Sequence, residues 1–161
     1  MSGAYSFILT LLISFSSLAE YIAQDDNYSC GPVAIYNALN YKGKHVSLDE
    51  IRRVAKTKPK DPSEGGGTTV ADFVIAAEFF LQTQLAQIPT YQFKRSGTYL
   101  IMMTVHTGSI DNQGAHVIFV NDGIAYNIKN GKVETELDYL IVQGMLYPSN
   151  NGVFPIVWEV Q

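Results

Sequence analysis

Cysteine and histidine are scarce in this sequence. Its 161 residues include one cysteine, Cys30, and three histidines: His45, His106 and His116. A single cysteine excludes a disulfide within the chain and any zinc site built from several thiolates. Because the histidines form no HExxH pattern, we expect neither a metal centre nor another cofactor. The thiol is therefore either a buried small hydrophobic side chain, the commoner role of cysteine, or a chemical reagent.

Charge is also sparse, and this excludes further classes of protein. Charged residues make up 16% of the chain and apolar residues 47%, the opposite of the balance that disorder requires. The net charge of -4 argues against a nucleic-acid partner, because such proteins neutralise phosphates with clustered cations. The densest basic group is explained by a solvated helix end and loop, and consists of Arg52, Arg53, Lys56, Lys58 and Lys60.

The N-terminal segment, residues 1–19, contains the one apolar run that could suggest a membrane, and its span from Ala4 to Ala19 is short for a membrane helix. It resembles a signal peptide before Glu20, but the first basic residue is Lys42. We expect a retained helix that docks on the domain or on an assembly partner. A signal or anchor would instead make the protein extracytoplasmic or membrane-associated. The remaining residues, 20–161, have the length of one domain.

The first half of this domain has the pattern of helices. One helix is expected from Cys30 to about Asn40, with apolar residues around most of its circumference. Ser47 and Glu50 have the spacing of a capping box and predict a second helix to about residue 55 or 56. A third helix, capped by Thr68 or Thr69, is expected to run to about residue 81.

The second half has the pattern of antiparallel strands. A turn at Asn121-Asp122-Gly123 predicts a hairpin. The segment 136–142 is compatible with a short helix or a strand. The expected strands are 99–105, 116–120, 124–128 and 152–160. Helices followed by antiparallel strands predict an α+β fold in which N-terminal helices pack on a C-terminal sheet.

The position of Cys30 favours the chemical role of its thiol. It begins the first expected helix, and both a helix N-terminus and a nearby imidazolium favour a thiolate. Gly31 leaves room for a substrate carbonyl to approach the backbone. Gln24, six residues upstream, is close enough to supply a side-chain amide to an oxyanion beside the Cys30 N–H.

A histidine from elsewhere in the chain should act as the base. His116 is the best candidate because it opens an apolar strand after a Gly-Ala pair, whereas His106 and His45 are explained by solvated positions beside turns. If Asn121 and Asp122 are the central residues of the hairpin turn, Asn127 lies opposite His116.

Two other orienting residues are compatible with the same hairpin. A different register offers Lys129, and a bulge brings Asn130 into reach. Asn127 can hold an imidazole by a hydrogen bond but adds no charge.

These residues resemble a known family. The run from Gln24 to Ile51 resembles the opening of C39-like peptidases of the papain-like cysteine peptidase superfamily, with a Gln six residues before a Cys-Gly pair. Similarity continues through the helix after Gly67-Thr68-Thr69 and the strand at 99–104. It then extends through Gly114–Val120 to Gly131.

The resemblance implies a papain-like fold and a role for each candidate. It makes Cys30 the nucleophile, Gln24 the oxyanion donor and His116 the base. Asn127 occupies the position where that family usually has Asp, and papain-type enzymes use Asn in the same role.

The sequence therefore predicts a cysteine peptidase that hydrolyses a peptide or isopeptide bond in a peptide or protein substrate. Two alternatives stay open. One is a catalytically inactive papain-like module that serves as a structural or binding component of a larger assembly, such as a virus particle. The other is an enzyme that transfers the acyl group to an amine instead of water, which the same residues support.

Overall fold

A computed structural model describes residues 20–59, 66–106, 113–128, 132–136, 138 and 155–161. The three expected helices are α1 (Cys30–Tyr41), α2 (Leu48–Val54) and α3 (Val70–Leu81). Ser47 Oγ accepts from the Glu50 N–H at 3.2 Å, and Thr69 Oγ1 accepts from the Asp72 N–H at 3.1 Å. The predicted caps therefore begin α2 and α3. Each helix in this part of the chain is too short or too polar to span a membrane.

Within the described residues, a six-stranded antiparallel sheet forms the second half of the fold. Its strands are β1 (Ala86–Ile88), β2 (Thr98–His106), β3 (Gln113–Asn121), β4 (Ile124–Ile128), β5 (Lys132–Glu136) and β6 (Ile156–Glu159). They lie in the order β1-β6-β2-β3-β4-β5, so the last strand of the chain is inserted between β1 and β2. The fold is α+β, as the sequence predicted.

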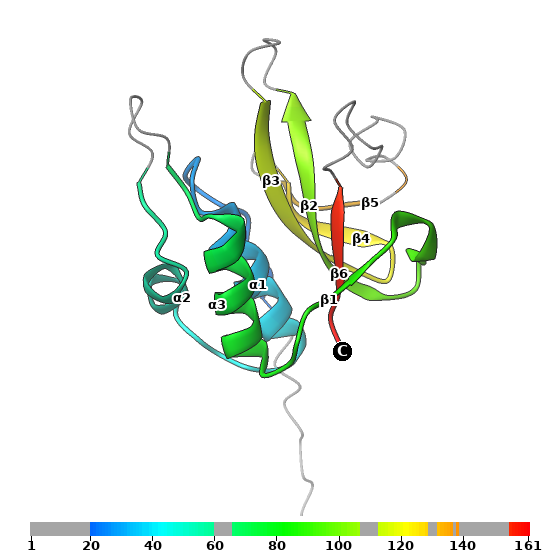
Figure 1. The fold of residues 1–161 in the computed structure, drawn as a ribbon, viewed down its shortest axis with the longest axis horizontal. Helices are drawn as coiled ribbons and strands as arrows, with labels where there is room; N and C mark the ends of the chain where they lie inside the picture. The colour runs from blue at the N-terminus through cyan, green and yellow to red at the C-terminus, as the bar shows by residue number, and fades with distance from the viewer. Residues whose placement is uncertain (1–19, 60–65, 107–112, 129–131, 137, 139–154) are drawn as a thin grey trace, which may run out of the picture.

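The helices cover one face of the sheet, and α1 packs against β2, β3 and β4 (Figure 1). Alternation along the strands sends side chains into two cores. On β3, Val117 and Phe119 join the helix-side core, whereas Ile118 and Val120 join a second core on the other face, with Phe93 packed against it. Both faces of the sheet are thus apolar at its centre, and α1 is fixed against β3.

The β3–β4 hairpin differs from the expected one. Asn121 pairs with Ile124, so Asp122 and Gly123 are the central turn residues, and both have positive φ values, 46° and 80°. This is the backbone of a type I′ turn, which Asp-Gly favours. The register is therefore shifted from the one that places Asn127 opposite His116, and that prediction is wrong.

Other differences concern short strands. Strands β1 and β5 were not predicted. In the described part of the segment expected at 152–160, β6 forms at Ile156–Glu159, and residues 152–154 lie outside the described residues. Of the segment expected at 136–142, Glu136 ends β5. Residues 137 and 139–142 lie outside the described residues, as does the apolar N-terminal segment, residues 1–19.

Candidate active site

Cys30 is the first residue of α1, and its side chain is half-buried where this helix meets β3. Burial raises the pKa of the Cys30 thiol above its ordinary value, and the charge of Asp26 adds to this effect. Hydrogen bonding by the backbone of Val117, Gly31 and Cys30 itself lowers the pKa, but by less. Desolvation is the largest of these causes, and it opposes the thiolate that the helix N-terminus is expected to favour. The contact with Val117 places the sulfur beside the residue that follows His116.

His116 lies on β3 and is half-buried. Its Nε2 atom is 2.9 Å from the backbone carbonyl oxygen of Asn127 on β4. A carbonyl oxygen can only accept, so this contact requires a proton on Nε2. In the neutral imidazole, Nδ1 then carries no proton and is the nitrogen able to act as a base.

Asn127 is completely buried and has a φ of 71°. Asparagine tolerates this left-handed conformation better than most residues with a side chain. Its Oδ1 accepts from the backbone N–H of Gln24 at 2.8 Å, and its Nδ2 donates to Gln24 Oε1 at 3.2 Å. Asn127 therefore connects the segment before α1 to the hairpin that carries His116.

Gln24 is held at both ends of its side-chain amide. Its Oε1 accepts from Asn127, and its Nε2 donates to the backbone carbonyl of Asp26 at 2.7 Å. An amide nitrogen carries two N–H groups, and the bond to Asp26 uses one of them. The other can serve a further acceptor.

The structure thus brings Gln24, Asn127 and His116 into one hydrogen-bonded chain. Asn127 meets the imidazole through its backbone carbonyl, whereas the sequence analysis expected its side chain. Of the alternative orienting residues, Lys129 and Asn130 lie outside the described residues. The described residues contain no group of three His, Cys, Asp or Glu side chains that could hold a metal ion.

The loop before Cys30 is tied to α2 by a polar network that sequence reasoning missed. Asp26 accepts hydrogen bonds from the backbone N–H groups of Tyr28 and Ser29 and from the Ser29 hydroxyl. Arg52 donates to Ser29 Oγ and to Asp26 Oδ2, each at 3.0 Å. Desolvation raises the pKa of Asp26. The hydrogen bonds from Ser29 and Tyr28 and the charge of Arg52 together lower this pKa by more, so the net shift is downward.

Gly31 has a packing role at the same helix start. A Cβ atom there would lie 3.1 Å from Cδ2 of Phe73, a buried residue of α3, and 3.7 Å from the side chain of Thr68. Glycine therefore allows α1 and α3 to approach closely. This contact is a reason for Gly31 that does not involve substrate.

Replacement of Arg52 by alanine should destabilise the protein by about 1–2 kcal/mol, because Asp26 and Ser29 lose charge-assisted hydrogen bonds in a partly exposed site. Urea denaturation measures this loss. Arg53→Ala is the matched control: its side chain is 75% exposed and its ion pair with Glu50 is 4.0 Å long. A loss of less than about 0.5 kcal/mol is expected for it. Equal losses in the two variants would contradict a structural role for the Arg52 network.

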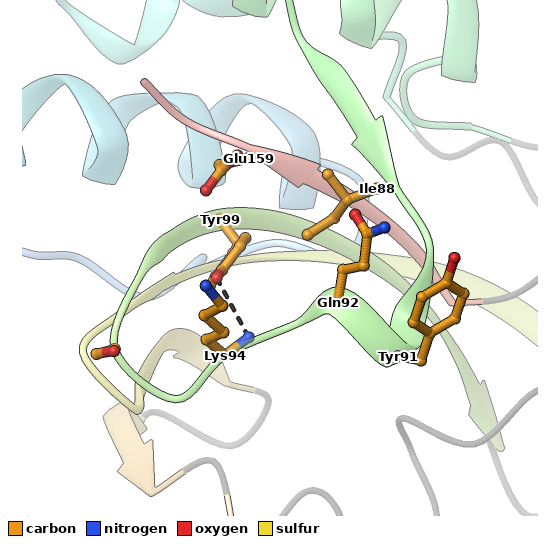
Figure 2. A pocket seen from close by; sticks show the side chains of 7 residues that line it. Ile88, Tyr91, Gln92, Lys94, Tyr99 and Glu159 are labelled. Atoms are coloured by element: carbon orange, nitrogen blue, oxygen red, sulfur yellow. Dashed lines mark hydrogen bonds between the residues drawn. The ribbon is translucent and has the colours of Figure 1, made fainter.

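A separate pocket of about 540 Å³ lies where β1, β2, β6 and the short helix Thr90–Gln92 meet. Figure 2 shows Tyr99 and Glu159 in its wall, with the Tyr99 hydroxyl bonded to the backbone N–H of Lys94. It is lined by Ile88, Tyr91, Gln92, Lys94, Ser96, Tyr99 and Glu159. None of the four candidate site residues contributes to it.

Comparison with known proteins agrees with this architecture. The model of the Peptidase C39 family matches residues 19–131. Among solved structures, the peptidase domain of Streptococcus ComA, a bi-functional ABC transporter involved in a quorum sensing pathway, superposes with a TM-score of 0.55 at 16% sequence identity. The superposition covers 88% of this chain and 100% of that domain, and it shows a shared fold. No curated protein sequence matches the chain.

The fold and the family match together define the class of protein. This chain belongs to the Peptidase C39 family, as the sequence resemblance implied, and has its α+β peptidase fold. The class is that of cysteine peptidases, whose substrates are peptides or proteins.

Proposed function

We propose that this protein hydrolyses peptide bonds through an acyl-enzyme formed on Cys30. The observation that carries the proposal is the hydrogen-bonded chain from Gln24 through Asn127 to His116, together with the contact between Cys30, at a helix N-terminus, and the backbone of Val117, the residue after His116. It supplies a base of defined tautomer and an oriented amide donor. Acyl transfer to a thiol needs both groups.

In the first half of the reaction, the Cys30 sulfur attacks the scissile carbonyl carbon while His116 Nδ1 accepts the thiol proton. The oxyanion receives hydrogen bonds from the Cys30 N–H and from the second N–H of Gln24 Nε2. When the carbon–nitrogen bond breaks, the imidazolium returns the proton to the leaving amine. Water, deprotonated by His116, then hydrolyses the thioester and regenerates the thiol.

The raised pKa of Cys30 gives this mechanism a specific pH dependence. A raised pKa favours the protonated form of the thiol, so in this mechanism His116 takes the thiol proton as a general base during attack. Acylation should therefore lose rate as the pH falls further below the pKa of the Cys30 thiol. It should persist toward alkaline pH.

Two probes of the intact protein test the proposal. Iodoacetamide, which reacts with thiolate, should alkylate Cys30 slowly at pH 7, with a midpoint above that of an ordinary thiol. p-Nitrophenyl acetate should acetylate Cys30 at pH 7, as detected by mass spectrometry, and about 10²–10⁴ times more slowly in His116→Ala. Equal acetylation rates in the two proteins would contradict the role of His116.

A catalytically inactive binding module is the second candidate, and the raised pKa of the Cys30 thiol favours it. The same experiment separates the two. If p-nitrophenyl acetate and a diverse peptide mixture leave Cys30 unmodified and the peptides uncleaved, the binding module becomes the better description.

A further inference from the structure

The side chain and the backbone of Asn127 engage different parts of the candidate site. Its side-chain amide is bonded at both ends to Gln24, and its carbonyl oxygen meets His116 Nε2. We propose that Asn127 is a positioning residue that couples Gln24 to His116. Its side chain orients the Gln24 amide, which is the oxyanion donor, and its backbone carbonyl orients the His116 imidazole. This inference rests on the proposed function and assigns the Asn127 side chain to Gln24 instead of to the base.

The geometry requires an amide at position 127. Gln24 presents a donor, its backbone N–H, and an acceptor, its Oε1, and Asn127 satisfies them with Oδ1 and Nδ2 respectively. Because Oε1 is fixed by Asn127, Nε2 must be directed to the Asp26 carbonyl on its other side. The orientation of the Gln24 amide is thus determined by Asn127, and full burial makes each of these bonds costly to lose.

Asn127→Asp gives opposite expectations for the two possible roles of the side chain. If this side chain oriented the imidazole, a carboxylate, the residue usual in the family at this position, would preserve or raise activity. In the proposed arrangement, the carboxylate faces Gln24 Oε1 without a donor between them. Gln24 is then displaced, and kcat for acyl transfer should fall about 10²-fold, the effect of losing one oxyanion donor.

Asn127→Gly separates the two functions of the residue. Glycine adopts a φ of 71° readily, so the carbonyl remains available to His116 while the side chain is lost. The rate of acetylation by p-nitrophenyl acetate should fall about 10²-fold, as in Gln24→Ala, and the acidic limb of the pH profile should stay where it is. The double variant that combines Asn127→Gly with Gln24→Ala should be no slower than Gln24→Ala alone, because both changes remove the same oxyanion donor, the Gln24 amide.

Nuclear magnetic resonance provides a readout that needs no turnover. In the wild type, His116 should be the Nε2–H tautomer, and the Gln24 backbone amide should be protected from hydrogen exchange. Asn127→Gly should abolish the protection and leave the tautomer unchanged. A changed tautomer with Gln24 still protected would overturn the inference, as would full activity in Asn127→Asp. If the wild type shows no acetylation, the proposed function fails, and the resonance data still decide the role of Asn127.

Discussion

Replacement of Cys30 by alanine should lower the rate of hydrolysis by about 10⁴-fold or more, the largest effect expected of a single substitution in this protein. The chain has no second cysteine, and the proposed acyl-enzyme cannot form without a nucleophile at the start of α1. Hydrolysis of p-nitrophenyl acetate, corrected for the spontaneous rate, measures the loss.

Cys30→Ser controls for packing. A hydroxyl is close in size to a thiol but is a much weaker nucleophile beside a base arranged for sulfur, so hydrolysis should also be lost while the fold is retained. Circular dichroism and urea denaturation should show both variants folded, because a half-buried side chain of this size contributes little to the core. Retention of more than about a tenth of the activity in either variant would contradict the role of Cys30 as the nucleophile.

Local sequence signals were sufficient for the helices and for the candidate nucleophile. Ser47 and Thr69 cap their helices through hydrogen bonds to residues three positions ahead, an interaction that depends only on neighbouring residues. Cys30 begins α1 as the local apolar pattern predicted, although Ser29 before it makes no side-chain capping bond. The placement of the candidate nucleophile was therefore available from the sequence.

The pairing of the hairpin was predicted less well because two turn positions fit the same residues. The structure uses Asp122 and Gly123 at the centre of the turn, whereas the sequence analysis used Asn121 and Asp122. A shift of one residue in the turn moves the cross-strand partner by two. The pairing of β3 with β4 ends at Phe119 and Tyr126. The next residue, Asn127, has a positive φ, and its carbonyl lies within hydrogen-bonding distance of His116.

The bonds that organise the site join residues far apart in sequence. Gln24 and Asn127 are separated by 103 positions, and Arg52 reaches Ser29 across 23. No periodicity or cap encodes such pairs, because they depend on how α1, α2 and the hairpin pack. The sequence could supply the candidate residues. It could not show that the side chain of Asn127 bonds to Gln24 while its carbonyl contacts His116.

An aromatic stack beneath the site leads to the second large expected effect. Phe119 is fully buried on β3, with its ring centroid 6.2 Å from that of Tyr21 and 5.7 Å from that of Tyr126. Tyr21 precedes Gln24, and Tyr126 is adjacent to Asn127. The stack therefore supports both of the segments that are joined by the hydrogen bonds between Gln24 and Asn127.

Phe119→Ala should lower the free energy of unfolding by about 3–5 kcal/mol, because a large cavity opens between α1 and the sheet. Urea denaturation measures the change. Since this loss approaches the total stability of a small domain, Phe119→Leu serves as a second variant, with an expected loss of about 1 kcal/mol. Phe79→Ala, the same truncation at a side chain that is 63% exposed, should cost less than about 0.5 kcal/mol.

The stack should also affect catalysis in a way that burial alone does not explain. In Phe119→Leu, Tyr21 and Tyr126 lose their shared aromatic neighbour, so the separation between Gln24 and Asn127 should vary more and acetylation should slow by more than the small stability loss implies. Ile118→Val, at a buried position on the opposite face of the same strand, should cost a similar stability without slowing acetylation. Equal acetylation rates in these two variants would show that the aromatic stack stabilises the fold but does not position the site.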